Sequence, residues 1–569
     1  MPLRLPPKPK ASKGKSKQLH IDYSTLDAAR ASAPSDWDSD DWLTEGTRQE
    51  EQGERYQSGP KAARHYTNST TCYRLAAALS PSAFDPRYNC ARVFQTLATD
   101  HSAAPACLEA LDNAIQGYRE GLAVLPDGEG GTARIDGLFN LAQADVALYE
   151  MFDEGVAAVE REAERALQAA QEAKQLFVEV ERLQRVEMEK VFGASGPDAD
   201  EAGDESEAMD EAGSSAGGSA TEVQAVETTI VTPQLIVDTL IEAVALDVSL
   251  YSSVSSPEDQ AALRDSATAA LARADALRAI IPRSPSSPSQ PDDLDLELAL
   301  ARASALSTFS PTSPDATAYL QSFLSSLASP RVELLSLLAD SLVDSLPLSS
   351  PLSSLLPTLE TALQTYQQAS ALLSSRLSPP KNVPSAHIPV LLSANLVAQS
   401  SVHLLAYTLS SHSPSETSRP HLTEHLKAAH QLALDALAAP KSGLSLAVPA
   451  SSRAGAAKPT LALVRAPAST EPRTDWRTLS AVRAALFTLV RVRLRLDPSA
   501  EGWEGEKKQF WALWRAVGLG AARAGADEAA LRRREVGWWA EESGEDRVSE
   551  AMSAEEREGE RAWWSSLAE

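Results

Sequence analysis

The chain has 569 residues, with 52 Lys and Arg against 78 Asp and Glu, which gives a formal net charge of −26 at pH 7. This length exceeds what one hydrophobic core supports, so we expect several domains or one extended repeat array. The negative charge disfavours direct binding to nucleic acid or to an anionic membrane, because their phosphates would repel it, and favours a basic protein as partner. Three cysteines, Cys72, Cys90 and Cys107, are too few for a disulfide framework and are typical of small buried side chains in a reducing compartment.

Residues 1–46 are predicted to form a disordered tail. Basic residues recur as far as Lys17 and no acid precedes Asp22, a pattern typical of a nuclear-import signal or of a simple solvated tail. The segment lacks the apolar core of a secretory signal, so we expect a soluble protein of the cytoplasm, the nucleus or both. Trp37 and Trp42 alternate with acids at the end of this tail, and they form either a short linear motif or a staple docked on the first helix.

Residues 47–192 contain three degenerate copies of a helical-hairpin pattern. Small residues at fixed spacing from an aromatic let two antiparallel helices approach, and a closing proline ends the second helix. The copies read Gly53-x-x-Tyr56 and Tyr73-x-x-Ala76-x-x-x-x-Pro81; then Ala91-x-x-Phe94, Ala114-x-x-x-Tyr118 and Pro126; then Leu141-Ala142 and Ala173-x-x-x-Phe177. This pattern resembles the tetratricopeptide repeat, which implies an all-α, helical-hairpin repeat solenoid with a protein-binding inner groove.

The spacing between copies departs from that family, whose period is about 34 residues. We expect the extra residues in long loops, near 98–106 and 126–133. An amphipathic helical bundle with coincidental Ala and Tyr spacing is the alternative.

One group of tetratricopeptide proteins clamps the C-terminal carboxylates of chaperones with Lys, Asn and Arg side chains. The resemblance aligns Asn89 with the asparagine of that clamp, but Glu50, Glu54, Asp136 and Asn140 stand where the other clamp residues would be. The resemblance therefore implies an inner groove that is unsuited to a carboxylate. Asn89 and Asn140 remain candidate partner-binding residues.

The chain beyond these copies is predicted to alternate between helices and flexible linkers. Residues 193–231 form an acidic linker in which Asp204, Glu205 and Glu207 are candidate contacts for a basic partner, although a purely solubilising insertion explains them equally well. Thr232 and Pro233 then start a diverged helical-hairpin array over residues 232–438. Its first helix is the most membrane-like segment, but Asp238, Glu242 and Asp247 predict a buried helix instead. A flexible linker is expected over 439–473.

The last block, residues 474–569, holds eight of the ten tryptophans. Most of them should seal the end of the solenoid against water. The terminal pair, Trp563 and Trp564, is either part of that seal or an exposed anchor for a partner.

One short motif points to metal chemistry, namely His421-Leu-Thr-Glu424-His425, which matches the H-x-x-E-H pattern of inverted zinc peptidases. The match is five residues long and has no evident third ligand, so a surface helix is the preferred interpretation. No phosphate-binding glycine loop, nucleophile elbow or Cys-x-x-Cys pair is found. We therefore predict no enzyme activity, no catalytic residue, no cofactor and no metal.

The sequence as a whole predicts a non-catalytic protein–protein interaction module. The sharper hypothesis is a chaperone or assembly adaptor for a basic client, because the organisation is similar to that of tetratricopeptide chaperones of ribosomal proteins, and a ribosomal or chromatin-like client is implied. A general scaffold that binds partners through apolar groove anchors is the alternative, and a zinc hydrolase is a remote one. The sequence predicts neither the oligomeric state nor the identity of the partner.

Overall fold

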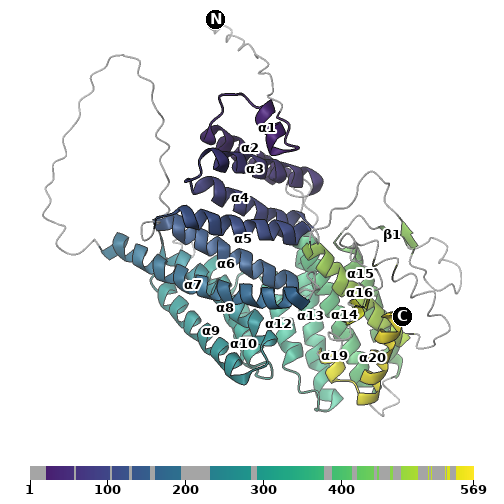
Figure 1. Ribbon diagram of the computed structural model, residues 1–569. Coiled ribbons are helices and arrows are strands. Elements are labelled where there is room, and N and C mark those ends of the chain that lie inside the picture. The colour runs from purple at the N-terminus through teal and green to yellow at the C-terminus, as the bar shows by residue number, and fades with distance from the viewer. Residues whose placement is uncertain are drawn as a thin grey trace, which may run out of the picture.

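The first half of the molecule is a column of antiparallel helices, in which each helix from α2 onward packs on the next in the chain and α1 lies against α3 (Figure 1). The computed structural model describes residues 21–568 except for 57–58, 103–105, 127–130, 154–159, 194–230, 284–290, 377–386, 413–418, 441–444, 448–461, 465–475, 497–510, 512–513, 515–531, 534 and 538–545. The column comprises α1 (Leu26–Ser32), α2 (Ser39–Tyr56), α3 (Gly59–Leu79), α4 (Asp85–Thr96) with its π-helical continuation η1 (Leu97–His101), α5 (Ala106–Val124), α6 (Gly131–Asp153) and α7 (Glu160–Gly193).

The second half continues the array and brings it back toward the first half. It comprises α8 (Pro233–Ser253), α9 (Pro257–Arg278), α10 (Asp293–Phe309), α11 (Asp315–Ser326), α12 (Val332–Asp344), α13 (Leu352–Arg376), α14 (His387–Ser411), α15 (Arg419–Ala438), α16 (Trp476–Leu496), α19 (Arg547–Glu550) and α20 (Ala554–Ala568). Helix α16 returns far enough to contact η1. The predicted all-α helical-hairpin solenoid is confirmed. Within the described residues its one sheet is a short antiparallel pair, β1 (Ser445–Ala447) with β2 (Ala462–Val464), inside the segment predicted as a flexible linker.

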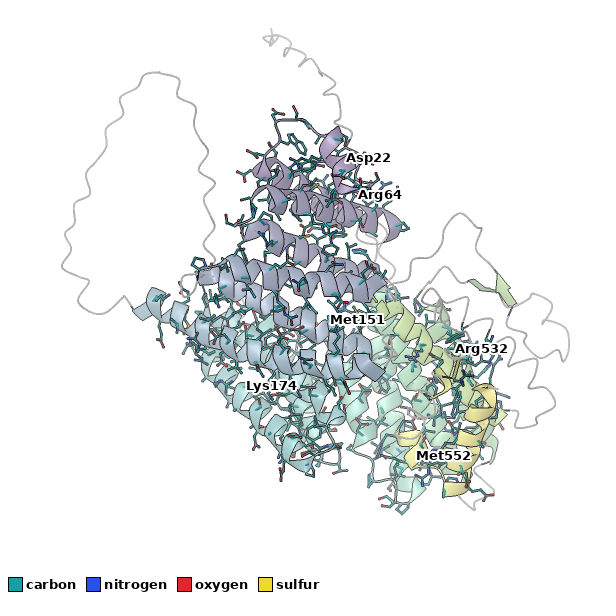
Figure 2. The ribbon with its side chains drawn as sticks, viewed as in Figure 1. Asp22, Arg64, Met151, Lys174, Arg532 and Met552 are labelled. Carbon is teal, nitrogen blue, oxygen red and sulfur yellow. The ribbon has the colours of Figure 1, made fainter. Side chains whose placement is uncertain are left out.

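Small residues and aromatics hold the hairpins of the first half together, as their spacing predicts. Ala114, Tyr118, Ala173 and Phe177 are all buried, and Met151 (labelled in Figure 2) is buried in one cluster with Ala114 and Tyr118. An ion pair also links two hairpins: Lys174 Nζ on α7 lies 2.5 Å from Asp247 Oδ1 on α8. The first three hairpins begin at residues 39, 85 and 131, so their steps along the chain are equal.

The extra length of each copy lies mainly in the helices, so the prediction of long loops is wrong. Residues 98–101, expected in a loop, belong to η1, which extends α4, and residues 131–133 already belong to α6. Helices α3, α5 and α6 contain 21, 19 and 23 residues. Longer helices bury more apolar surface per hairpin, and a spacing rule based on loops does not capture this.

Gly46 is one position where two helices approach too closely for a side chain. A Cβ atom there would lie 2.5 Å from Cε1 of Tyr73, whose ring is buried. We expect Gly46→Ala to lower the free energy of unfolding by about 1–3 kcal/mol, because the ring and α3 must shift. Urea denaturation followed by circular dichroism measures this. Gly559→Ala on α20 is the control, since no atom lies within 4 Å of its Cβ position and alanine favours the helix. Equal stability of the two variants would contradict the prediction.

The N-terminal segment is ordered earlier than predicted. The tail was expected to be disordered through residue 46, whereas α1 and the first turns of α2 lie inside it. Thr25 caps α1 by accepting a hydrogen bond from the Ala28 amide, and Trp42 is buried with Ile21 and Ala29. The Trp37 ring meets that of Trp42 edge-on at 4.8 Å. The two tryptophans therefore act as the staple, which supplies the apolar area that a composition-based prediction of disorder did not count.

Helix α14 is the one helix of the described chain that is long and apolar enough to cross a membrane, judged by length and composition. It packs between α13, α15 and α16. Its Ser393 and Ser400 hydroxyls donate to the carbonyls of Ala436 and Ala429, both 2.8 Å away on α15. The long apolar run thus forms the centre of the second half of the array.

Candidate functional site

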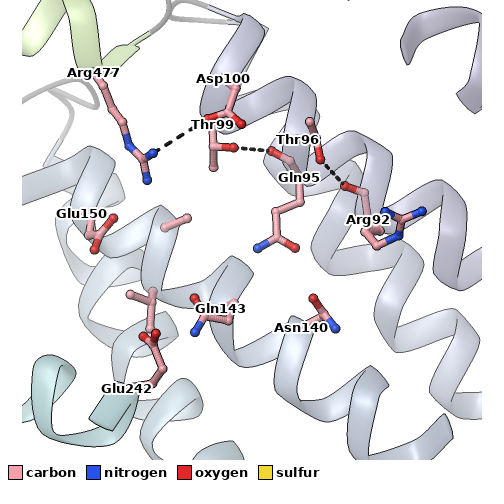
Figure 3. Close-up of a pocket in the computed structure, with 12 residues that line it drawn as sticks. Arg92, Gln95, Thr96, Thr99, Asp100, Asn140, Gln143, Glu150, Glu242 and Arg477 are labelled. Atoms are coloured by element: carbon pink, nitrogen blue, oxygen red, sulfur yellow. Dashed lines mark hydrogen bonds and ion pairs between the residues drawn. The ribbon is translucent and has the colours of Figure 1, made fainter. Parts of the chain in front are cut away.

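A hollow of about 440 Å³ opens where the two halves of the array meet (Figure 3). We call it the inner hollow. Its walls come from α4 and η1 on one side and α6 on the other, with one residue each from α8 and α16. The lining side chains are Arg92, Gln95, Thr96, Thr99, Asp100, Asn140, Gln143, Val146, Ala147, Glu150, Glu242 and Arg477. Most of these are polar or charged, so the hollow suits a hydrogen-bonding or charged ligand group.

Two tyrosines beside the inner hollow, the buried Tyr118 and the half-buried Tyr88, orient its amide side chains. Tyr118 donates its hydroxyl hydrogen to Gln95 Oε1 at 2.7 Å, and Asn140 Nδ2 donates to the Tyr88 hydroxyl at 3.0 Å. Burial raises the pKa of both phenols, so they stay neutral donors and acceptors. The amides are consequently fixed in direction before any ligand arrives.

Carboxylates dominate the charge of this inner face. Asp100, Glu150 and Glu242 line the inner hollow, and Asp238 and Glu297 continue the acidic surface beside Glu242. Burial, followed by the charges of Glu297 and Glu242, raises the pKa of Asp238 to about 6. Burial also raises the pKa of Glu242, and Glu297 adds to that rise although Gln143 donates a hydrogen bond that opposes it. In the described part of the chain no cation lies within ion-pair distance of Asp238, Glu242 or Glu297.

The two cations at the inner hollow differ in how firmly they are held. Arg92 Nη2 lies 2.7 Å from Glu50 Oε1, and Glu50 is buried and also accepts a hydrogen bond of 3.0 Å from the Tyr73 hydroxyl. Arg477 Nη1 lies 3.8 Å from Asp100 Oδ1, and both side chains are 38% exposed. The two arginines are similarly exposed, at 41% for Arg92 and 38% for Arg477, and they differ in their partners. Arg92 pairs with a buried carboxylate, whereas the carboxylate that pairs with Arg477 is itself open to solvent.

The structure separates the two predicted inner-groove asparagines. Asn140 lines the inner hollow, whereas Asn89, half-buried on α4, is not among the lining residues. Of the acids at the clamp positions, Glu50 is already paired with Arg92 and is therefore not available to a ligand. The candidate acids Asp204, Glu205 and Glu207 lie outside the described residues.

The terminal tryptophan pair belongs mainly to the seal of the solenoid. Trp564 is 0% exposed, and its ring stacks on Phe487 of α16 with centroids 5.5 Å apart. Trp563 is partly buried against the same cluster, which includes Trp511 and Trp514. Trp564 is therefore not an exposed anchor, contrary to the alternative stated for the pair, because its ring is buried inside the fold.

The two histidines of the zinc motif do not converge. His421 is 74% exposed and lies 3.8 Å from Glu424 in the first turns of α15. His425 turns toward α14, where its Nδ1 lies 3.0 Å from Nδ1 of His403. Burial lowers the pKa of His403 to about 4, and that of His425 is lowered as well. No group of three His, Cys, Asp or Glu side chains suited to a metal ion occurs among the residues that the structure describes.

Sequence reasoning missed most of the inner hollow, notably Asp100, Glu150 and Arg477. A partial signal existed in α8, where Asp238 and Glu242 are four residues apart and so share one helix face. Their charge had excluded a membrane span, and the same observation could have marked an acidic inner face.

Comparison with known proteins assigns no family: no protein-family model matches this chain, and a search of curated proteins finds no similar sequence.

Proposed function

We propose that this chain is a non-catalytic binding module that takes a basic segment of a client protein into its inner face, as a chaperone or assembly adaptor. The observation that carries the proposal is the row of carboxylates Asp238, Glu242 and Glu297, which have no paired cation in the described chain and continue into a polar hollow. Asp238 and Glu242 are half-buried and lack a paired cation in the described chain, so they gain most from a ligand that brings the missing charge.

The raised pKa of Asp238 and of Glu242 supports this proposal energetically. Each carboxylate is held beside like charges in a partly desolvated place, which costs free energy when it is ionised. Lys or Arg side chains from a client would offset that cost and lower both pKa values. The net charge of −26 adds long-range attraction, which raises the association rate of a basic partner.

The likeness to tetratricopeptide proteins supports the same use of the inner face. It makes a ribosomal or chromatin-like client and a location in the cytoplasm, the nucleus or both part of the proposal. The proposal assigns no catalysis and no metal to the His421 motif.

Affinity capture at low and high salt tests the proposed function. We expect the full-length chain to retain a basic protein at low ionic strength and to release it at high salt, because the Debye length falls from about 10 Å at 0.1 M to about 3 Å at 1 M. A variant with Asp238→Asn, Glu242→Gln and Glu297→Gln should retain clearly less. The bound proteins are identified by mass spectrometry.

The matched control changes three exposed acids elsewhere, with Glu164→Gln and Glu189→Gln on α7 and Glu558→Gln on α20. It removes the same charge and should retain the client as the unmodified chain does. Equal loss in both variants would contradict a site on the inner face. Partners that resist high salt would instead indicate the scaffold alternative with apolar anchors.

A further inference from the structure

We propose that Arg477 occupies the place of a client's basic side chain at the rim of the inner hollow, and that client binding displaces it. The inference rests on the proposed function and adds an internal competitor to it. Because Arg477 belongs to α16, its displacement alters the contact between that helix and the first half of the array. The ligand group is a guanidinium or ammonium, carried by an Arg or Lys of the client.

The placement of Arg477 is what singles it out. Among the described side chains of α16 it alone lines the inner hollow, and it reaches Asp100 on η1, which belongs to the first half of the chain (Figure 3). Its partner is thus a carboxylate that an incoming cation would also bind. Asp100 and Arg477 sit at the point where α16 touches η1, so their ion pair spans one of the contacts between the halves.

The pair has the features of an exchangeable contact. At 3.8 Å and 38% exposure on both sides it is worth little, since exposed ion pairs contribute a small fraction of a protein's stability. Arg477 also lies in the first turn of α16, where the positive end of the helix dipole disfavours a cation. By contrast, Arg92 is held by a buried carboxylate at 2.7 Å and stays in place.

A client can form more ion pairs in the inner hollow than Arg477 can. An extended peptide can direct one basic side chain at Asp100 and others at Glu242 and its acidic neighbours, whereas Arg477 is tethered to α16. The amides fixed by Tyr118 and Tyr88 can in addition accept or donate hydrogen bonds to the peptide backbone. Binding therefore exchanges the Asp100–Arg477 ion pair for several new contacts.

Fluorescence anisotropy with labelled hexa-arginine tests the inference at low ionic strength. Arg477→Ala should bind this peptide about two- to fivefold more tightly, because the competitor is gone. Arg264→Ala is the matched control, since this exposed residue of α9 removes the same charge far from the hollow. It should bind as the unmodified chain does. Equal affinities of the two variants would overturn the role of Arg477 and leave the proposed function intact.

Two further measurements separate the possible failures. In the Asp100→Asn background, Arg477→Ala should no longer improve binding, because the contested carboxylate is absent; a persisting gain would overturn the competition. A peptide in which citrulline replaces every arginine keeps the shape without the charge. If the unmodified chain binds hexa-arginine no better than this peptide, the proposed function itself fails. Circular dichroism of each variant confirms that the helices are intact.

Discussion

Arg491→Ala is expected to lower the free energy of unfolding of the C-terminal block by about 3–5 kcal/mol. Arg491 lies inside the molecule, where its Nε is 2.7 Å from Glu560 Oε1, its Nη2 is 3.0 Å from the Ser549 hydroxyl and its guanidinium also pairs with Asp546. The side chains of Arg491 and Glu560 are 3% and 4% exposed. Removing one partner of a buried pair leaves the other charge desolvated, and this costs more than the pair itself contributes.

The pH dependence of this block follows from the same contacts. Burial alone would raise the pKa of Glu560, but the charges of Arg491 and Arg495 outweigh it and hold the pKa below its usual value. A carboxyl group with a depressed folded-state pKa stabilises the fold above its unfolded-state pKa and loses that contribution as the pH falls. The C-terminal block should therefore lose stability on acidification.

Urea denaturation and hydrogen exchange of α20 measure the effect of Arg491→Ala. Arg557→Ala is the control, because Arg557 is exposed on α20 and its loss changes the net charge equally. It should alter stability by less than about 0.5 kcal/mol. If both variants unfold alike, the buried pair does not hold α20 on α16.

Local rules predicted the helices well, because the relevant signals lie within a few residues of each other. Thr232 with Pro233 and Ser256 with Pro257 start α8 and α9 where capping chemistry places them. The composition rules did less well at the N-terminus, where the burial of Trp42 depends on α3, a contact that no local window contains. The prediction of long loops instead of long helices failed for a similar reason, since the length of the helices in a hairpin depends on the neighbouring helices against which they pack.

The candidate site is a product of tertiary structure, so little of it could be read from the sequence. Asp100 and Arg477 meet because the array curls back on itself, and their separation along the chain carries no signal. Asn140 was found through its position in the repeat, but Tyr88, the half-buried tyrosine that orients it, was not. Trp564 shows the opposite error, because an unusual aromatic pair suggested a surface anchor where the fold required a core side chain.

Asp145→Asn is expected to stabilise the protein at alkaline pH. Asp145 on α6 is 1% exposed, and its Oδ2 has no hydrogen-bond partner in the described structure. The neighbouring cations are engaged elsewhere, since Arg119 pairs with Glu172 at 2.7 Å and Arg165 pairs with Asp112. Burial, and then the charge of Glu172, raises the pKa of Asp145 to about 7 against the pull of the two arginines. Ionising this group therefore costs free energy in the folded state alone.

The sign of the effect follows from proton linkage. Between the unfolded-state pKa of 3.8 and the folded-state value of about 7, the native chain holds a proton that the unfolded chain has lost, so stability falls as the pH rises. From pH 5 to pH 8 this group should remove on the order of 3 kcal/mol, at about 1.4 kcal/mol for each pKa unit. Asparagine keeps the shape and cannot ionise, so Asp145→Asn avoids that loss.

Urea denaturation at pH 5 and at pH 8 isolates the contribution of Asp145. Other acids with a raised pKa, such as Asp340 at about 6 through desolvation, act in the same direction in both proteins, so the difference between variant and unmodified chain cancels them. That difference should grow from pH 5 to pH 8 by on the order of 3 kcal/mol in favour of Asp145→Asn. Glu558→Gln, which changes an exposed acid, should show no such growth. A difference independent of pH would mean that Asp145 ionises without cost, and that water or a shifted arginine compensates its charge in solution.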